Sequence, residues 1–325
     1  MKRKRRSSPA RSAMKLLCLM LGLVLAVMVG ATVYFQAQMG LLPSLGEASG
    51  LLSKLDWELP SLSLGKEGQI GGRGSHIVNI LLIGQDGREG EERARSDSMI
   101  LCTFNKKTKQ VTMTSFLRDL YVQIPGQGGN RINAAYATGG MELLDETLEE
   151  NFGLYIDGNV EVDFQHFAEI IDLLGGVEIE LRQDEADFIN EETGSTLTAG
   201  PQLLAGEQAL MYSRIRKLDA DGDFSRTGRQ RKVMSALLSA YRGSGTGTML
   251  SLLKQVLPML ETDMGNVELL MLAVELAPML ADAEIVSQYV PAAGTYTNET
   301  INGMSVLVPD TQAVRTMLEK TLLTE

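Results

Sequence analysis

The sequence predicts an α/β fold in which a mixed central β-sheet is sandwiched by helices and follows one N-terminal transmembrane helix. Two observations lead to this prediction. One uncharged apolar segment near the N-terminus is long enough to cross a membrane. The chain beyond it alternates short apolar runs, typical of buried strands, with longer segments whose apolar residues repeat at helical spacing. Such a mixture packs as helices around a sheet.

The apolar segment, residues 16–35, has about 20 apolar or small residues, the length that a helix needs to span the hydrocarbon core. The basic tail 1–15 carries seven Lys or Arg and no acidic residue, so the positive-inside tendency keeps it in the cytoplasm. A cleaved signal peptide ending near Ala31 is the alternative, but signal cores usually run about 7–15 residues. We therefore expect a single-pass anchor in the cell membrane, with the rest of the chain extracytoplasmic.

The charge of the exported part limits its ligands. After the basic tail, 23 Lys and Arg face 41 Asp and Glu, a net charge of −18. Such a domain does not bind nucleic acid through bulk electrostatics, so an anionic ligand needs a local cluster of arginines. The chain has only two histidines and no HExxH motif, which excludes a zinc protease of that class. It also lacks the GxSxG motif of serine hydrolases and the GxxxxGK[ST] motif of P-loop enzymes.

Residues 36–75 show no sustained periodicity and contain several Pro and Gly, which predicts a linker before a domain over 76–325. The domain opens with an apolar run over 77–83, read as a strand buried on both faces. Strands over 99–104 and 111–116 flank a polar turn and form an antiparallel hairpin. Further strands are expected over 177–181, 286–290 and 304–308.

Helical periodicity predicts the remaining elements. Two helices end at Gly153 and at Gly175-Gly176, because glycine at the end of a helix adopts the left-handed conformation readily. The other expected helices cover residues 206–216, 224–241, 249–260, 267–280 and 311–323.

Charged residues gather at one end of the predicted hairpin. If the turn is centred near Lys107, Asp97 faces Arg118, and Asp119 lies alongside. The first strand leads to the same edge if it runs beside the hairpin in the matching direction. The gathered set is then Asp86, Arg88, Arg95, Asp97, Arg118 and Asp119. Carboxylates suit Mg²⁺ and arginine forks bind phosphate, so this edge predicts a phosphate site with a metal.

A second basic set surrounds the acidic turn 219–223. Arg214 and Arg216 precede the turn, and Arg226, Arg229 and Gln230 share one face at the start of the next helix. The positive end of the helix dipole also favours an anion there. Any one of these arginines is more often a surface residue or an ion-pair partner. Two such sets in an acidic domain favour a phosphate ligand.

A series of motifs carries a family resemblance: Gly84-Gln85-Asp86-Gly87-Arg88, Arg95-Ser96-Asp97-Ser98, Ser115-Phe116-Leu117-Arg118-Asp119, Arg131-Ile132-Asn133-Ala134-Ala135-Tyr136, Leu174-Gly175-Gly176-Val177, and Arg214-Ile215-Arg216 followed by Asp223-Phe224-Ser225-Arg226-Thr227-Gly228-Arg229-Gln230. Together they resemble the LytR-CpsA-Psr family over about residues 77–241. Two departures are Leu117, where the family usually has Pro, and Gln85 with Gly87, which replace a pair of Ser.

The resemblance implies a membrane-anchored enzyme that moves a glycan phosphate from a polyisoprenyl-pyrophosphate carrier onto peptidoglycan, with the isoprenoid in an apolar tunnel between sheet and helices. It assigns catalysis to Asp97, Arg118, Asp119 and Arg226, and Mg²⁺ (or Mn²⁺) to Asp97 and Asp119. The implied substrate-binding residues are Asp86, Arg88, Arg95, Arg131, Arg214, Arg216, Asp223, Arg229 and Gln230.

Alternatives stay open at this point. A non-catalytic module could hold lipid-linked wall precursors without turnover, and a hydrolase could use the same site with water as the acceptor. A transcriptional regulator is disfavoured, because an exported acidic domain cannot reach the chromosome.

Overall fold

The computed structural model describes residues 69–85 without 73 and 74, residues 96–242, and residues 255–323 with short gaps at 257–258, 266–267, 270–271, 273–274, 277–278 and 280–282. The segment predicted to cross the membrane, residues 16–35, lies outside these ranges, as do most of the helices expected over 249–260 and 267–280. None of the helices in the described ranges is both long and apolar enough to span a bilayer.

Six strands of the described residues form a mixed sheet at the centre of the domain, in the order β10-β3-β2-β1-β6-β9. Strand β1 runs antiparallel to β2 and parallel to β6, and β3 runs antiparallel to β2 and parallel to β10. The predicted mixed α/β architecture is therefore confirmed. The strands are β1 (Ile77–Gln85), β2 (Ser96–Asn105), β3 (Gln110–Phe116), β6 (Gly158–Glu161), β9 (Glu261–Thr262) and β10 (Glu284–Val290).

The predicted hairpin of β2 and β3 is confirmed together with its register. Pairing runs from Asn105 opposite Gln110 to Met99 opposite Phe116. Asp97 and Arg118 lie just beyond the last pair, at the same edge of the sheet. Strand β1 ends there too, because Gln85 pairs with Ser96.

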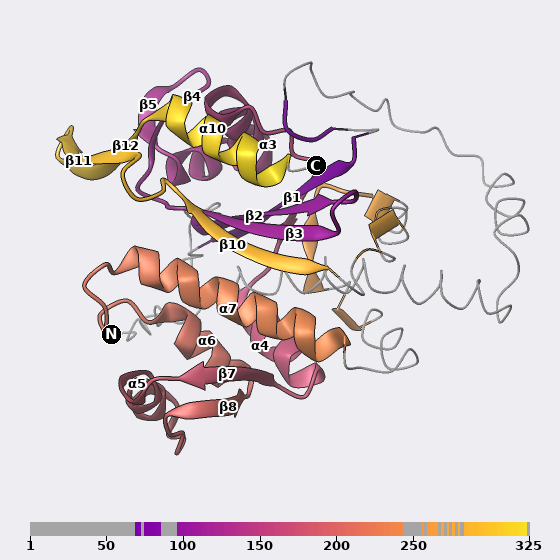
Figure 1. Ribbon diagram of the computed structural model, residues 1–325. Coiled ribbons are helices and arrows are strands. Elements are labelled where there is room, and N and C mark those ends of the chain that lie inside the picture. The colour runs from indigo at the N-terminus through magenta and orange to yellow at the C-terminus, as the bar shows by residue number, and fades with distance from the viewer. Residues whose placement is uncertain are drawn as a thin grey trace, which may run out of the picture.

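Helices cover both faces of the sheet (Figure 1). Helices α3 (Asn133–Phe152) and α10 (Thr311–Leu322) lie over one face, and α4 (Phe164–Leu173), α6 (Gly206–Arg214) and α7 (Asp223–Arg242) lie over the other. The remaining elements are α5 (Gln183–Thr193) and three two-stranded sheets: β4 (Tyr121–Ile124) with β5 (Gly128–Arg131), β7 (Val177–Leu181) with β8 (Gly200–Leu204), and β11 (Tyr296–Ile301) with β12 (Met304–Pro309).

The glycine ends of the predicted helices are confirmed, and the predicted end of the helix over 206–216 is wrong. Helix α3 ends at Gly153 in the left-handed conformation, and α4 is followed by Gly175 and Gly176 with positive φ. Helix α6 stops at Arg214 rather than at residue 216, because Ile215 turns to ψ 124 and leaves the helix. Arg216 therefore lies in a loop that leads to α7.

The folded domain begins before residue 75. Ile70, within the range expected to be a linker, is buried and forms a bridge with Leu154. The buried Asn79 side chain of β1 fixes this segment, because its Nδ2 donates to the carbonyls of Ile70 at 2.7 Å and Tyr155 at 2.8 Å. Its Oδ1 accepts a hydrogen bond from Thr103 at 2.7 Å. Both polar atoms of this buried side chain are therefore paired within the fold.

Candidate active site

The N-terminal part of α7 lies against the sheet edge where β1 and β3 end. Ser98 Oγ of β2 donates to Gln230 Oε1 at 2.8 Å, and Arg231 Nη1 donates to Ser115 Oγ of β3 at 2.6 Å. Ser115 lies opposite Ile100, and alternate residues of a strand such as Ser98 and Ile100 point to the same face, so Ser98 and Ser115 both face α7. These contacts bring the two sets of predicted site residues together.

Three arginines converge on Asp223, the first residue of α7. Ion pairs join its carboxylate to Arg118 Nε at 2.9 Å, to Arg216 Nη2 at 2.7 Å and to Arg226 Nη2 at 3.2 Å. These residues come from the loop after β3, from the loop after α6 and from α7 itself. The structure thus places side chains from distant segments around one carboxylate at the positive end of a helix.

Asp119 joins this group through Arg118 and Arg131. Arg131 Nη1 of β5 donates to Asp119 Oδ1 at 2.9 Å, and Arg118 Nε lies 3.8 Å from Asp119 Oδ2. We call the four arginines 118, 131, 216 and 226, with Asp119 and Asp223, the Asp223 cluster. Among the described side chains of the cluster, cations outnumber carboxylates by four to two.

The C-terminal part of the chain holds the loop that carries Arg118 and Asp119. The Leu117 N–H donates to the Val290 carbonyl at 2.9 Å, and the Leu307 N–H donates to the Asp119 carbonyl at 2.9 Å. Proline has no N–H, so the bond at Leu117 is one that the usual residue of the family could not make. No local pattern predicts this support, because both partners lie far along the chain.

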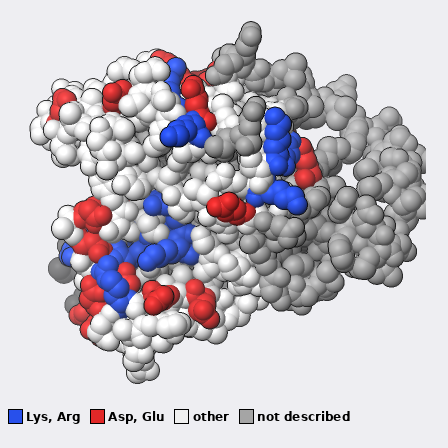
Figure 2. Space-filling model, in the orientation of Figure 1, with Lys and Arg blue, Asp and Glu red and all other residues white. Residues whose placement is uncertain are grey.

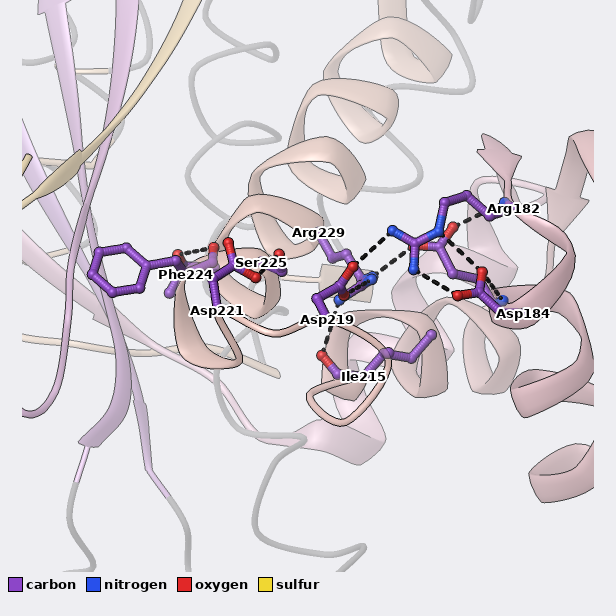
Figure 3. Close-up of polar contacts among 10 residues, drawn as sticks. Arg182, Asp184, Ile215, Asp219, Asp221, Phe224, Ser225 and Arg229 are labelled. Atoms are coloured by element: carbon purple, nitrogen blue, oxygen red, sulfur yellow. Dashed lines mark hydrogen bonds and ion pairs between the residues drawn. The ribbon is translucent and has the colours of Figure 1, made fainter. Parts of the chain in front are cut away.

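Arg229 has a different environment from Arg226, although the two share one face of α7. Its Nε donates to the buried Glu185 at 2.7 Å, its Nη1 donates to the Ile215 carbonyl at 3.2 Å, and its Nη2 pairs with Asp219 (Figure 3). All three guanidinium nitrogens are thus engaged within the protein. Arg229 holds the loop between α6 and α7, which carries Arg216.

Arg182 completes what we call the Glu185 network, formed by Arg182, Asp184, Glu185, Asp219 and Arg229 (Figure 3). Its Nη1 donates to Asp219 Oδ1 at 2.8 Å and its Nη2 to Asp184 Oδ2 at 2.9 Å. Burial raises the pKa of Asp219, but hydrogen bonds from Arg229 and Arg182 outweigh it and hold that pKa below its ordinary value. Neither Glu185 nor Arg182 was predicted to belong to the site.

The other predicted residues are placed only in part. The Arg214 guanidinium lies 5.4 Å from the centroid of the Phe164 ring, a cation–π distance. Asp97 is in β2, but its side chain is not described, and Asp86, Arg88 and Arg95 lie outside the described residues. Within the described ranges, no group of three or more His, Cys, Asp or Glu is placed to hold a metal ion. The metal pair Asp97 and Asp119 stays a prediction.

The surface reflects this distribution of charge. Figure 2 shows Lys and Arg side chains gathered on the side of the molecule where α7 begins, bordered by Asp and Glu. Arg216 contributes to the exposed part, with 47% of its side chain accessible, whereas Arg226 is only 9% accessible. A ligand approaching from solvent therefore meets Arg216 first and Arg226 deeper.

The sequence profile of the LytR_cpsA_psr family matches residues 63–322. The match covers the sheet, both helical layers and every described residue of the Asp223 cluster. The chain belongs to the LytR_cpsA_psr family.

Named relatives and a solved structure agree with this assignment. The chain is 34% identical over 200 residues to polyisoprenyl-teichoic acid–peptidoglycan teichoic acid transferase TagU of Enterococcus faecalis, covering 58% of this chain and 64% of that protein. It is 40% identical over 172 residues to the corresponding TagT of Bacillus subtilis, covering 51% and 53%. The match thus spans between half and two thirds of these relatives. A structure of the family protein YwtF (TagT) with bound octaprenyl pyrophosphate lipid superposes with a TM-score of 0.58 at 27% identity, covering 76% of this chain and 91% of that one.

Proposed function

We propose that this chain is an extracytoplasmic phosphotransferase that moves a glycan phosphate from a polyisoprenyl-pyrophosphate carrier onto peptidoglycan. The observation that carries the proposal is the convergence of Arg118, Arg216 and Arg226 on Asp223 at the sheet edge. Such forks bind phosphate oxygens in bidentate fashion. The names of the relatives support the donor and the acceptor, and the octaprenyl pyrophosphate in YwtF supports the lipid carrier.

In this reaction the arginines position the donor and neutralise charge. An acceptor hydroxyl on peptidoglycan forms a bond to the phosphorus that carries the glycan, and the bridging P–O bond to polyisoprenyl phosphate breaks. The hydroxyl proton passes to a general base. Charge on the phosphate oxygens is stabilised by fixed guanidinium groups and the α7 N-terminus, with no covalent enzyme intermediate.

The Asp119 carboxylate beside Arg118 fits a divalent metal. Asp119 Oδ2 has only the 3.8 Å contact with Arg118 among the described residues, and 31% of the side chain is accessible. A hard carboxylate oxygen of this kind suits Mg²⁺. We propose that Asp119 and Asp97 hold Mg²⁺ or Mn²⁺, which, when bound, neutralises phosphate oxygens.

The location is part of the proposal. The basic tail 1–15 and the apolar segment 16–35 support a single-pass anchor with the domain outside the cell membrane. Alkaline phosphatase fused after Ser75 is expected to be active. An inactive fusion, with a cytoplasmic reporter active at the same junction, contradicts the proposed location.

A transfer assay tests the activity. The full-length chain in detergent is given a synthetic polyprenyl-pyrophosphate glycan and peptidoglycan oligomers, with Mg²⁺ or with a chelator. We expect Mg²⁺-dependent transfer that falls by about 10²–10³ in Asp97→Asn, since one electrostatic stabiliser is lost. The matched control is Asp187→Asn, an exposed carboxylate on α5, which is expected to leave the rate unchanged.

The same assay separates the alternatives. Glycan phosphate released into water without a glycosylated oligomer identifies a hydrolase. Intact donor retained by the protein, with no turnover of any donor, identifies a binding module. Transfer that ignores the chelator, or a folded Asp97→Asn protein of full activity, contradicts the metal assignment.

A further inference from the structure

Arg231 is a buried cation with no acidic partner among the described side chains. It lies on α7 next to Gln230 and is 8% exposed. Its Nη1 donates to Ser115 Oγ at 2.6 Å, and its guanidinium lies 5.9 Å from the centroid of the Tyr289 ring. Its Nε is buried and has no hydrogen-bond partner. No carboxylate of the described residues pairs with it.

Burying a charge without a counter-ion costs free energy of folding. The neighbouring Arg229 is also buried, but it has two carboxylate partners. Arg229 is 4% exposed and pairs with both Glu185 and Asp219. Arg231 has a hydroxyl and a ring instead, and its burial lowers the pKa of the guanidinium to about 10. A buried ion without a counter-ion destabilises a fold unless a ligand supplies the opposite charge. An anion at Arg231 removes this cost.

The order of residues along α7 indicates which anion fits. Arg226 of the Asp223 cluster comes first, and Arg231 follows about 7.5 Å further along the helix axis, at about 1.5 Å per residue. Buried apolar side chains then follow, at positions Val233, Met234, Leu237 and Leu238. A polyisoprenyl pyrophosphate has the same order of polarity, with two adjacent phosphates and then an apolar chain.

We propose that Arg231 binds the lipid-proximal phosphate of the polyisoprenyl pyrophosphate, while the Asp223 cluster binds the glycan-bearing phosphate. This inference rests on the proposed function and extends it to the leaving group. When the bridging P–O bond breaks, its electron pair stays on polyisoprenyl phosphate, whose negative charge rises by one. A guanidinium fixed in a buried position stabilises this developing charge more strongly than solvent does.

The test compares Arg231→Met with Lys232→Met in the full-length protein. Lys232 is the next residue of α7 and is exposed, so it controls for the loss of a positive charge from the helix. Binding is measured with farnesyl pyrophosphate, inorganic pyrophosphate and farnesol. We expect Arg231→Met to weaken both pyrophosphates by about 10- to 100-fold, the usual effect of losing a hydrogen bond to a charged group. Farnesol binding is expected to be unchanged, and Lys232→Met to resemble wild type.

The melting temperature in the absence of ligand gives a second readout. Removing an uncompensated buried charge is expected to raise it in Arg231→Met, whereas a purely structural arginine would leave a less stable protein when removed. Arg231→Lys, which keeps the charge but loses the fork, is expected to bind more weakly than wild type and more tightly than Arg231→Met. Unchanged pyrophosphate affinity in both folded variants overturns the inference.

The outcomes also separate this inference from the proposed function. If Arg226→Met loses pyrophosphate affinity and catalytic transfer but Arg231→Met keeps both, the proposed function stands and the role of Arg231 is wrong. If Arg231→Met loses affinity while wild-type protein binds the donor without transfer to any acceptor, the role of Arg231 in binding stands and the proposed transfer is wrong.

Discussion

Two arginine clusters meet at the start of α7, and they differ in their balance of charge. In the Asp223 cluster four arginines face two aspartates, and Arg216 is 47% accessible to solvent. In the Glu185 network two arginines face three carboxylates, and the central pair, Arg229 and Glu185, is 4% accessible on each side (Figure 3). The first cluster carries excess positive charge at a sheet edge, whereas the central ion pair of the second is buried and its charges are balanced.

This difference in charge balance distinguishes arginines that can bind a ligand from arginines that support the fold. Arginines whose nitrogens are all engaged by carboxylates and a carbonyl fix the geometry of a loop. Arginines that share one carboxylate can exchange it for phosphate oxygens at little cost, because the local charge still favours an anion. We therefore assign Arg229 to positioning the loop that carries Arg216, and Arg226 to the ligand. The following predictions test this division.

The largest expected effect is on stability, in Arg229→Met. The substitution removes the cation 2.7 Å from the buried Glu185 carboxylate and leaves only a 3.9 Å contact with Arg182. Breaking a buried pair in this way costs about 3–5 kcal/mol of unfolding free energy. Denaturant unfolding followed by circular dichroism measures it. Arg182→Met is the matched control, because Arg182 is about half exposed and exposed ion pairs contribute about 0–1 kcal/mol. Equal losses in the two variants contradict the assignment of Arg229 as a buried support.

A smaller effect, on binding alone, is expected in Arg216→Met. Affinity for farnesyl pyrophosphate is expected to fall about 10- to 100-fold, because one charge-assisted hydrogen bond to phosphate is lost. Unfolding free energy is expected to stay within about 1 kcal/mol of wild type, because the side chain is half exposed. The control is Lys217→Met at the next, exposed position. Isothermal titration calorimetry gives the affinity, and loss of stability without loss of affinity reverses the predicted division.

The smallest effect is on how the unfolding free energy falls at acidic pH. Because the pKa of Asp219 is lowered in the folded state, its ion pairs contribute stability above the ordinary carboxylate pKa of about 3.9. That contribution is lost as pH falls through the lowered value, since the folded state then gains a proton. Asp219→Asn lacks this contribution, so its unfolding free energy is expected to fall less steeply than that of wild type below about pH 4. Parallel curves for the two proteins contradict the role of Asp219 as an ionised partner of Arg229.

The sequence was informative where one periodicity ran through a whole element. The run Ile77–Ile83 predicted β1, the polar turn near Lys107 predicted the register of β2 with β3, and glycine predicted the end of α3. Strand β5, Gly128–Arg131, has no large apolar side chain, so the alternation that predicts a strand is missing from the sequence. Its pairing with β4 therefore could not be predicted. Helix α5 was missed for a similar reason, since only three of its residues are buried.

The sequence by itself determined that Arg226, Arg229 and Gln230 share one face of a helix, because helical spacing is a local property of the chain. The tertiary structure decided how each of them is used. Arg229 pairs with Glu185, which lies on a helix about forty residues earlier. Asp223 pairs with Arg118, which follows a strand about a hundred residues earlier. Arg231, which no sequence motif singles out, contacts Ser115 and Tyr289, and none of the described carboxylates pairs with it. Whether an arginine supports the fold or receives a phosphate depends on which charges surround it in space, and those charges come from segments far apart in the chain.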